Sequence, residues 1–182
     1  MMISINEEIF LQELKENKIC FQDINKLLVE KLKSRHLKVA TAESCTGGLI
    51  SEEITALSGS SEVFDCGVCS YSNEIKEKVL GVDKTVLDTL GAVSEEVAIQ
   101  MADGVRHLAQ SDVAVSTTGI AGPTGATTDK PVGLVYIGVS ALKNTFAVKC
   151  FFCENRHNSR ERVRELAAGY AMYRLYLEIS GD

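Results

Sequence analysis

Residues 37–57 read LKVATAESCTGGLISEEITAL. The apolar run at 37–40 is typical of a buried strand, whereas apolar residues recur at helical spacing over 49–57. Between them, TAESCTGG at 41–48 places hydroxyls, a thiol and two glycines where a strand turns into a helix. Glycines allow a ligand to approach the backbone, and the free N–H groups of a helix start bind anions. The segment therefore predicts a phosphate site, a nucleophile, or a capped helix start that binds nothing.

The rest of the chain alternates between strand and helix patterns. Helical spacing predicts helices over 6–17, 22–35, 74–80, 83–90 and 94–110, and a last one of about twenty residues beginning at Asn158 or Ser159. Apolar runs predict strands over 63–71 and 112–117, and a hairpin over 132–142 and 145–153. This order predicts an α/β fold, a three-layer α/β/α sandwich with a mixed, largely parallel sheet.

We expect one domain over residues 1–182, in which 1–21 form an N-terminal helical extension. Asn73 is expected to cap the helix at 74–80 and Gly81 to end it, while Ser94 is expected to cap the next long helix.

Composition limits the function classes. A net charge of −6 argues against a general nucleic-acid surface or an acidic membrane surface. A small phosphorylated substrate is compatible with this charge, because hydrogen-bond donors in the binding site can outweigh the weak repulsion of a phosphate by the net negative charge of the protein. The N-terminus lacks the basic and apolar regions of a signal peptide, and no apolar run reaches membrane-spanning length. We therefore expect a cytoplasmic protein that binds neither nucleic acid nor membrane.

The chain has six cysteines, of which Cys66 and Cys69, and again Cys150 and Cys153, have the C-x-x-C spacing of zinc sites. Both pairs lie in predicted strands, where residues three apart point to opposite faces. Neither pair is expected to chelate one ion. We predict reduced, largely buried thiols and no metal site.

Three predicted loops follow strand ends, at 44–48, 71–76 and 118–128. In open α/β sheets, ligands bind at the carboxyl ends of the strands. The candidates for one pocket are Ser44, Thr46, Tyr71, Ser72, Asn73, Lys76, Thr118 and Gly119. Neither G-x-x-x-x-G-K-[ST] nor G-x-G-x-x-G is present, which disfavours ATP-dependent and dinucleotide chemistry.

Five ordered motifs resemble the C-terminal domain of the competence/damage-inducible CinA proteins: TAESCTGG at 41–48, YSNE at 71–74, GAVSE at 91–95, TGIAGP at 118–123 and KPVG at 130–133. The resemblance spans roughly residues 22–178. Stand-alone members of that family are nicotinamide-nucleotide amidohydrolases. The resemblance therefore implies hydrolysis of nicotinamide mononucleotide to nicotinate mononucleotide and ammonia in pyridine-nucleotide salvage, without a cofactor, by a homodimer.

The chain departs from the family pattern at three places. Asp65-Cys66-Gly67 and Gly125-Ala126 each stand where a Gly-Gly pair is usual, and Asn158-Ser159-Arg160 stands where Gly-Asp-Arg is usual. The first change concerns strand packing. The other two lie near the expected phosphate and ribose side of the substrate, so they bear on affinity more than on chemistry.

The resemblance points to Ser44 as the nucleophile and Lys76 as its proton acceptor, with Tyr71 nearby. A partly desolvated lysine can lose its proton near neutral pH and accept one from serine, although many helix lysines are simply exposed. Cys45 is the rival nucleophile. On a strand end Ser44 and Cys45 would face opposite ways, one to the pocket and one to the core. Glu43 is expected to be a local hydrogen-bond acceptor.

The remaining candidates concern substrate binding. Backbone N–H groups around Thr46, Gly47 and Gly48 are candidates for an oxyanion site or a phosphate cradle. By the resemblance Asn73, Thr118, Gly119 and Gly122 line the nucleotide. Arg160 is the phosphate candidate because its planar fork matches phosphate oxygens, the alternative being a plain surface arginine.

A second function from another class fits the same residues. The protein could be a non-catalytic nucleotide-sensing or partner-binding module linked to competence or DNA damage. Both functions require nucleotide binding, but only the enzyme releases ammonia with turnover.

Overall fold

The computed structural model describes residues 4–141, 143–153 and 159–181. Its elements in chain order are α1 (Glu7–Glu16), the 3-10 helix η1 (Phe21–Asp23), α2 (Ile24–Ser34), β1 (Val39–Glu43), α3 (Leu49–Thr55), the 3-10 helix η2 (Ser60–Glu62), β2 (Phe64–Cys69), α4 (Asn73–Leu80), α5 (Lys84–Leu90), α6 (Glu95–Ala109), β3 (Val113–Gly119), β4 (Leu134–Ser140), β5 (Thr145–Phe151) and α7 (Arg160–Ser180).

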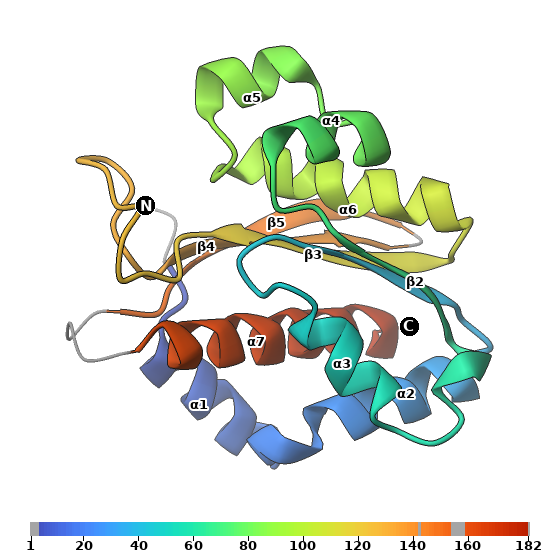
Figure 1. The fold of residues 1–182 in the computed structure, drawn as a ribbon. Coiled ribbons are helices and arrows are strands. Elements are labelled where there is room, and N and C mark those ends of the chain that lie inside the picture. The colour runs from blue at the N-terminus through green and yellow to red at the C-terminus, as the bar shows by residue number, and fades with distance from the viewer. Residues whose placement is uncertain (1–3, 142, 154–158, 182) are drawn as a thin grey trace.

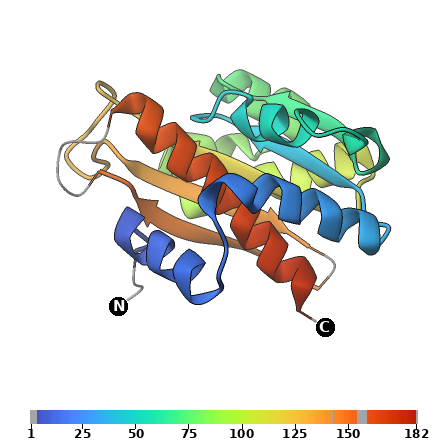
Figure 2. The same ribbon diagram turned by 90° about the horizontal axis from the view of Figure 1, so that it is seen from below.

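The five strands form one sheet in the order β2-β1-β3-β4-β5 (Figure 1). β1 pairs in parallel with β2 and with β3, whereas β4 runs antiparallel to β3 and to β5. On one side of the sheet α6 lies against the strands with α4 and α5 packed on it, and α1, α2, α3 and α7 lie on the other side (Figures 1 and 2). The predicted three-layer sandwich with a mixed sheet and a late hairpin is confirmed.

The central strands are buried on both faces, which explains their continuous apolar sequence. Along β1 and β3, side chains alternate between two hydrophobic clusters. Val39, Val113 and Val115 join the cluster under α7, whereas Ala40 and Ala114 join the smaller cluster under α6. The alternation follows the two-residue period of a strand, and it fixes the register of the sheet between the helical layers.

The connections around β1 create the place for a ligand. From β1 the chain passes through α3 to β2 on one side, and then returns through α6 to β3 on the other side of β1. Such a switch in strand order leaves a crevice at the carboxyl ends of the two strands where the order reverses. These ends are Glu43 of β1 and Gly119 of β3.

Several element ends differ from the sequence-based expectation. β1 continues to Glu43, so residues 41–43 belong to the strand, and β3 continues to Gly119, so Thr118 also lies in a strand. Helix α4 is capped by Ser72, whose hydroxyl accepts from the N–H of Ile75, and not by Asn73, which is its first residue. Gly81 ends α4 and Ser94 caps α6, as predicted.

The start of the last helix was predicted at Asn158 or Ser159. Ser159 caps α7 and accepts from the N–H of Arg162, which confirms one of the two predicted starts. The alternative start, Asn158, lies outside the described residues.

The N-terminal extension packs on α7 and on the edge of the sheet. Phe10 of α1 is fully buried, with its ring centroid 4.9 Å from that of Tyr170 in an edge-to-face arrangement. Ile5 pairs with β5 by donating its N–H to Lys149 and accepting from the N–H of Phe151. The predicted helix over 6–17 is thus found as α1, in contact with the domain.

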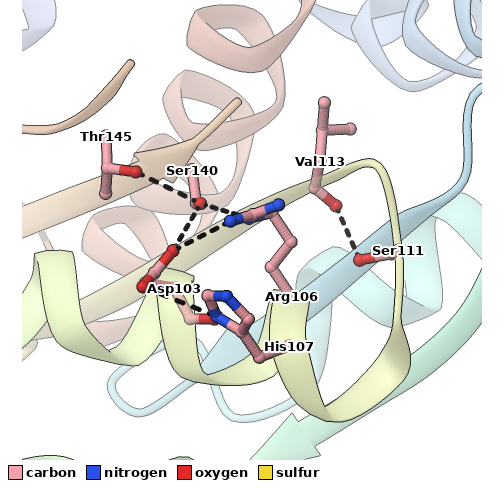
Figure 3. A network of polar contacts seen from close by, with 7 residues as sticks. All are labelled: Asp103, Arg106, His107, Ser111, Val113, Ser140 and Thr145. Atoms are coloured by element: carbon pink, nitrogen blue, oxygen red, sulfur yellow. Dashed lines mark hydrogen bonds and ion pairs between the residues drawn. The ribbon is translucent and has the colours of Figure 1, made fainter. Parts of the chain in front are cut away.

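Polar contacts tie the hairpin to α6 at the edge of the sheet opposite the crevice (Figure 3). The Nε of Arg106 donates to the Ser140 hydroxyl at 2.7 Å, and this hydroxyl lies 3.1 Å from the Asp103 carboxylate. Ser140 pairs with Ala114, at the beginning of β3. The network therefore fixes β4 onto α6 far from the carboxyl ends of the parallel strands.

Only the first cysteine pair, Cys66 and Cys69, lies within one strand as predicted, whereas Cys153 falls after the end of β5. Cys66 packs against the cluster under α6, whereas a Cβ placed on Gly48 would lie 3.3 Å from the Cys69 sulfur, on the α3 side. Cys150 is buried in β5, which ends before Cys153. None of the six cysteines, all of which lie in the described residues, forms a disulfide bond. Only Cys45 and Cys150 are buried, so the expectation of largely buried thiols is wrong. Within the described ranges no group of three or more His, Cys, Asp and Glu side chains is arranged to hold a metal ion. Over the same ranges no helix combines the length and apolarity needed to cross a bilayer.

Candidate active site

A cavity of about 310 Å³ opens at the carboxyl ends of β1 and β3. The three loops that follow strand ends meet there, as the topology predicts. The residues that line it are Ser44, Cys45, Tyr71, Asn73, Lys76, Ala92, Val93, Thr118, Gly119, Ile120, Ala121, Gly122, Thr124, Gly125 and Arg160. Eight of the eleven predicted site residues are in this wall, and Thr46, Gly47 and Gly48 are not.

Ser44 and Lys76 are in contact at the base of the site. Ser44 follows β1 directly, and its N–H donates to the carbonyl of Thr117 on β3. Lys76 lies on the inner side of α4 and is only 1% exposed. Its Nζ is 3.1 Å from the Ser44 Oγ and donates to the carbonyl of Ser70 at 2.6 Å. The amine is thus oriented by one acceptor while it faces the serine hydroxyl.

Burial changes the acidity of this lysine. Its removal from water lowers the pKa of Lys76 from 10.5 to about 8, against a smaller raising effect from Cys45. At pH 7 about one molecule in ten then has a neutral amine, compared with well under one in a thousand for an ordinary lysine. A neutral Lys76 can accept the Ser44 proton while one of its own N–H groups stays on Ser70.

Cys45 is a poor alternative nucleophile. Burial raises the pKa of its thiol to about 12, and a hydrogen bond with Thr117 opposes this by less. The thiol therefore stays protonated at neutral pH, whereas the thiolate is the reactive form. Cys45 packs in the core cluster and also reaches the cavity wall. The expected strict division between Ser44 and Cys45 is wrong, because β1 ends at Glu43 and strand alternation stops there.

Glu43 organises the loop that carries the nucleophile. Its side chain is fully buried at the end of β1. One carboxylate oxygen accepts from the Thr46 hydroxyl at 2.7 Å and from the N–H groups of Gly48 and Ile50 at 3.0 and 3.1 Å. The other accepts from the N–H and hydroxyl of Ser51, at 2.9 and 2.7 Å. Glu43 is the local hydrogen-bond acceptor that the sequence predicted, and its carboxylate caps the N-terminus of α3.

This arrangement corrects one expectation. The N–H groups around Thr46, Gly47 and Gly48 were candidates for an oxyanion site or a phosphate cradle, but the N–H of Gly48, like those of Ile50 and Ser51, donates to the carboxylate of Glu43. Gly47 and Gly48 instead serve the turn, since their φ angles of 62° and 100° lie in the left-handed region that favours glycine. They let the chain reverse between Ser44 and α3.

Arg160 and Tyr71 form the rim of the cavity. The Tyr71 side chain is 66% exposed, and its hydroxyl accepts from Arg160 at 3.0 Å. Arg160 also donates to the carbonyl of Gly122 at 2.8 Å. The two residues thus connect the loops after β2 and β3. Tyr71, predicted beside the nucleophile, points its hydroxyl to Arg160 at the mouth of the cavity.

The opposite wall is built on β3. The Thr118 hydroxyl donates to the carbonyl of Ala92 at 2.6 Å, which holds the loop before α6 against the strand. A Cβ on Gly119 would lie 2.7 Å from the Leu134 carbonyl oxygen, so this position excludes larger residues. Ala92 and Val93 contribute apolar surface to the wall. Sequence reasoning missed these two as lining residues, although they lie in the GAVSE motif.

Arg164 is a second residue that sequence reasoning missed. It lies one turn after Arg160 on α7, and its Nε and Nη2 donate to the carbonyl of Thr46 at 3.2 and 2.7 Å. Its spacing from Arg160 places it on the same side of the helix.

A larger cavity of about 410 Å³ lies between α2, α3 and α7. Its charged residues are already paired, since Arg162 donates to Glu7 and Glu165 and Asn25 donates to Glu53. A serine and a lysine in contact distinguish the smaller cavity, which is therefore the candidate site.

The comparison with known proteins gives the family. The model of the CinA C-terminal domain matches residues 21–179. The chain belongs to the CinA C-terminal domain family. A putative competence-damage inducible protein of Caldanaerobacter subterraneus subsp. tengcongensis is 49% identical over 157 residues, which cover 86% of this chain and 38% of that protein. One of Clostridium beijerinckii is 45% identical over 160 residues, with coverages of 85% and 38%. The chain thus spans under two fifths of the length of these curated relatives.

Solved structures of this CinA domain family have the same fold and a similar size. The competence/damage inducible protein CihA from Agrobacterium tumefaciens superposes with a TM-score of 0.83 at 35% identity, covering 88% of this chain and 96% of that one. A CinA superfamily protein from Escherichia coli gives a TM-score of 0.81 at 28% identity, with coverages of 89% and 91%.

Proposed function

We propose that this CinA domain is an amidohydrolase that converts nicotinamide mononucleotide to nicotinate mononucleotide and ammonia, with Ser44 as nucleophile and Lys76 as general base. The observation that carries the proposal is the 3.1 Å contact between the Lys76 Nζ and the Ser44 Oγ, with the pKa of that amine lowered to about 8. A serine and an activating base within hydrogen-bond reach are the recurring arrangement of covalent catalysis.

The first half of the reaction forms an acyl-enzyme. Neutral Lys76 takes the hydroxyl proton as the Ser44 Oγ attacks the carboxamide carbon. The tetrahedral intermediate carries an oxyanion, which needs nearby N–H donors. Since the N–H of Gly48 donates to Glu43, and Thr46 and Gly47 lie outside the cavity wall, the candidate donor from this loop is the N–H of Cys45. Protonated Lys76 then returns its proton to the amide nitrogen, the C–N bond breaks, and ammonia leaves.

The second half returns the enzyme to its starting state. Lys76, neutral again, takes a proton from a water molecule that attacks the ester carbon of the acyl-enzyme. The ester bond breaks with proton return to the Ser44 oxygen, and the carboxylic acid that forms loses its remaining proton to water or ammonia and leaves as nicotinate mononucleotide. Lys76 carries the protons that move to and from Ser44, so these steps balance with groups that the chain and water supply.

The charges of the cavity suit this substrate. Lys76 lies at the base, beside Ser44, and Arg160 lies at the rim, so we place the carboxamide inside and the phosphate outside. The pyridinium charge would lower the pKa of Lys76 further once the substrate is bound, because like charges disfavour the protonated amine. Apolar Ala92, Val93 and Ala121 offer surface to the ring.

The test is release of ammonia from nicotinamide mononucleotide by purified protein, compared with Ser44→Ala and Cys45→Ser. We expect turnover by the wild-type chain and by Cys45→Ser, and none by Ser44→Ala with an unchanged circular dichroism spectrum. Nucleotide binding without ammonia release would instead support the sensing or partner-binding module. Turnover that persists in Ser44→Ala but not in Cys45→Ser would make Cys45 the nucleophile.

A further inference from the structure

Arg164 reaches the nucleophile loop from the helical layer opposite Lys76. It lies on α7, whereas Lys76 lies on α4, across the sheet (Figure 1). Both its Nε and its Nη2 donate to one atom, the carbonyl oxygen of Thr46. We propose that Arg164 is a positioning residue that holds Ser44 at its working distance from Lys76. The inference rests on the proposed role of Ser44 as nucleophile.

Thr46 is the point at which the loop is held. Its hydroxyl donates to Glu43 at 2.7 Å and lies 2.7 Å from the Thr117 hydroxyl, which fixes the loop to β1 and β3. Its carbonyl faces the other way, to Arg164, and accepts weakly from the N–H of Leu49 at 3.4 Å. The fork of Arg164 therefore supplies the anchor on the α7 side.

The loop needs this anchor because of its own sequence. Gly47 follows Thr46 in a left-handed conformation, and a Cβ on Gly47 would lie 3.8 Å from the Arg164 Nη2. Glycines allow many backbone conformations, so Gly47 restrains Thr46 little, whereas Gly48 is held by the bond from its N–H to Glu43. The charged fork provides two hydrogen bonds to one carbonyl, and charge-assisted bonds are stronger than neutral ones.

The reaction rate depends on the separation between the Ser44 hydroxyl and the Lys76 amine, and not only on the presence of both groups. The hydroxyl and the amine come from different layers, so their separation depends on where the loop lies relative to α4. A shift of about 1 Å in a reacting group can reduce a rate by about 10²-fold. Loss of Arg164 should therefore slow reactions of Ser44 while Lys76 remains buried.

The test measures Ser44 reactivity directly, without the nucleotide. Phenylmethanesulfonyl fluoride labels activated serines: the Oγ–S bond forms, the S–F bond breaks, the hydroxyl proton passes to Lys76, and fluoride leaves. We would measure the second-order rate constant of labelling at Ser44 by mass spectrometry from pH 6 to 10 on the full chain. The variants are Arg164→Ala, Arg164→Lys and the matched control Arg162→Ala, an arginine of the same helix that pairs with Glu7 and Glu165.

We expect Arg164→Ala to be labelled about 10²-fold more slowly at every pH, with the midpoint of the pH profile unchanged. Arg164→Lys, which keeps the charge but not the fork, should show a smaller loss, and Arg162→Ala none. A purely stabilising role would lower the melting temperature without changing the labelling rate of the folded protein.

The proposal is overturned if folded Arg164→Ala is labelled at the wild-type rate, or if Arg162→Ala slows equally. A midpoint that moves toward that of an ordinary lysine also overturns it, because Arg164 would then act through the burial of Lys76. If Arg164→Ala fails to fold, Arg164→Lys decides by the same criteria. A wild-type chain that labels at Ser44 but releases no ammonia would refute the proposed function and leave this inference standing; absence of labelling refutes the inference.

Discussion

The Lys76 Nζ lies 3.1 Å from the Ser44 Oγ, although the two residues are 32 positions apart in the chain. Ser44 follows the central strand β1, and Lys76 projects inward from α4, which follows the neighbouring strand β2. The parallel pairing of β1 with β2 brings both strand ends to one edge of the sheet. Ser72 caps α4 four residues before Lys76, and this sets the face of the helix on which the amine lies.

The first prediction concerns the role of Lys76 as base. Lys76→Ala should reduce turnover by roughly 10²–10⁴-fold, the usual range for a positioned proton-transfer group. Lys76→Arg should not restore it, because a guanidinium stays protonated. Steady-state kinetics with nicotinamide mononucleotide checks both, and Lys78→Ala, an exposed lysine of the same helix, is the control. Near-normal turnover by Lys76→Arg would show that Lys76 is not the general base and that its positive charge alone contributes to turnover.

The second prediction concerns pH. The reactive form of Lys76 is the neutral amine, so kcat/KM should rise with pH through one ionisation near the lowered pKa of about 8. In kcat the midpoint should lie lower, because the bound pyridinium charge disfavours the protonated amine. Rate profiles between pH 6 and 9.5 measure both midpoints. A kcat/KM that is flat across this range would contradict Lys76 as the base.

The third prediction concerns stability. Because burial lowers the pKa of Lys76 in the folded state, the unfolded chain binds more protons between about pH 8 and 10.5, and stability rises with pH over that window. Below it the folded protein carries a penalty of roughly 3 kcal/mol. Lys76→Met should therefore raise the melting temperature at pH 7, with a gain that shrinks toward pH 10. The exposed Lys78→Met should show neither effect, and a lower melting temperature of Lys76→Met at pH 7 would oppose the argument.

Patterns local in sequence predicted most of the fold and the base of the site. The apolar runs and helical spacings predicted the strands and helices, and the position of the loops after strand ends predicted that Ser44 and Lys76 lie beside one cavity. The elements that failed depend on contacts across the chain. Asn73 is a good cap in isolation, but Ser72 is the residue whose hydroxyl accepts from a free N–H in the first turn of α4, that of Ile75.

The nucleophile loop shows why the rest was not predictable. A glycine pair before a helix is typical of an anion-binding site. The structure shows that the anion at this helix start is the buried carboxylate of Glu43. Likewise, Arg164 is 118 positions from Thr46, and nothing in a helical pattern indicates which carbonyl an arginine reaches. Both contacts follow from tertiary packing, which sequence periodicity does not record.

The fourth prediction concerns Glu43. Glu43→Gln replaces one acceptor oxygen with an amide that donates, so N–H groups of α3 lose a partner in a buried place. We expect a loss of roughly 2–4 kcal/mol in the free energy of unfolding. Urea denaturation checks this, with Glu52→Gln on the exposed side of α3 expected to change it by less than about 0.5 kcal/mol. Equal stabilities of Glu43→Gln and wild type would show that the carboxylate is not needed as a helix cap.

The fifth prediction concerns Arg160 and separates binding from chemistry. Its guanidinium lies at the rim, bonded to Tyr71 and to the carbonyl of Gly122, and these two hydrogen bonds of Arg160 involve neither Ser44 nor Lys76. If this fork binds the substrate phosphate, Arg160→Ala should raise KM for nicotinamide mononucleotide by roughly 10–100-fold, the value of one charged hydrogen bond, and change kcat much less.

The control for Arg160 is the substrate without its phosphate. The corresponding nucleoside should be hydrolysed by Arg160→Ala and wild type with similar kcat/KM, because the removed charge has no partner on it. Arg162→Ala should behave as wild type with both substrates, since that arginine pairs with Glu7 and Glu165. An equal loss on nucleotide and nucleoside would mean that Arg160 shapes the cavity by holding Tyr71 and the loop after β3, and that the phosphate binds elsewhere.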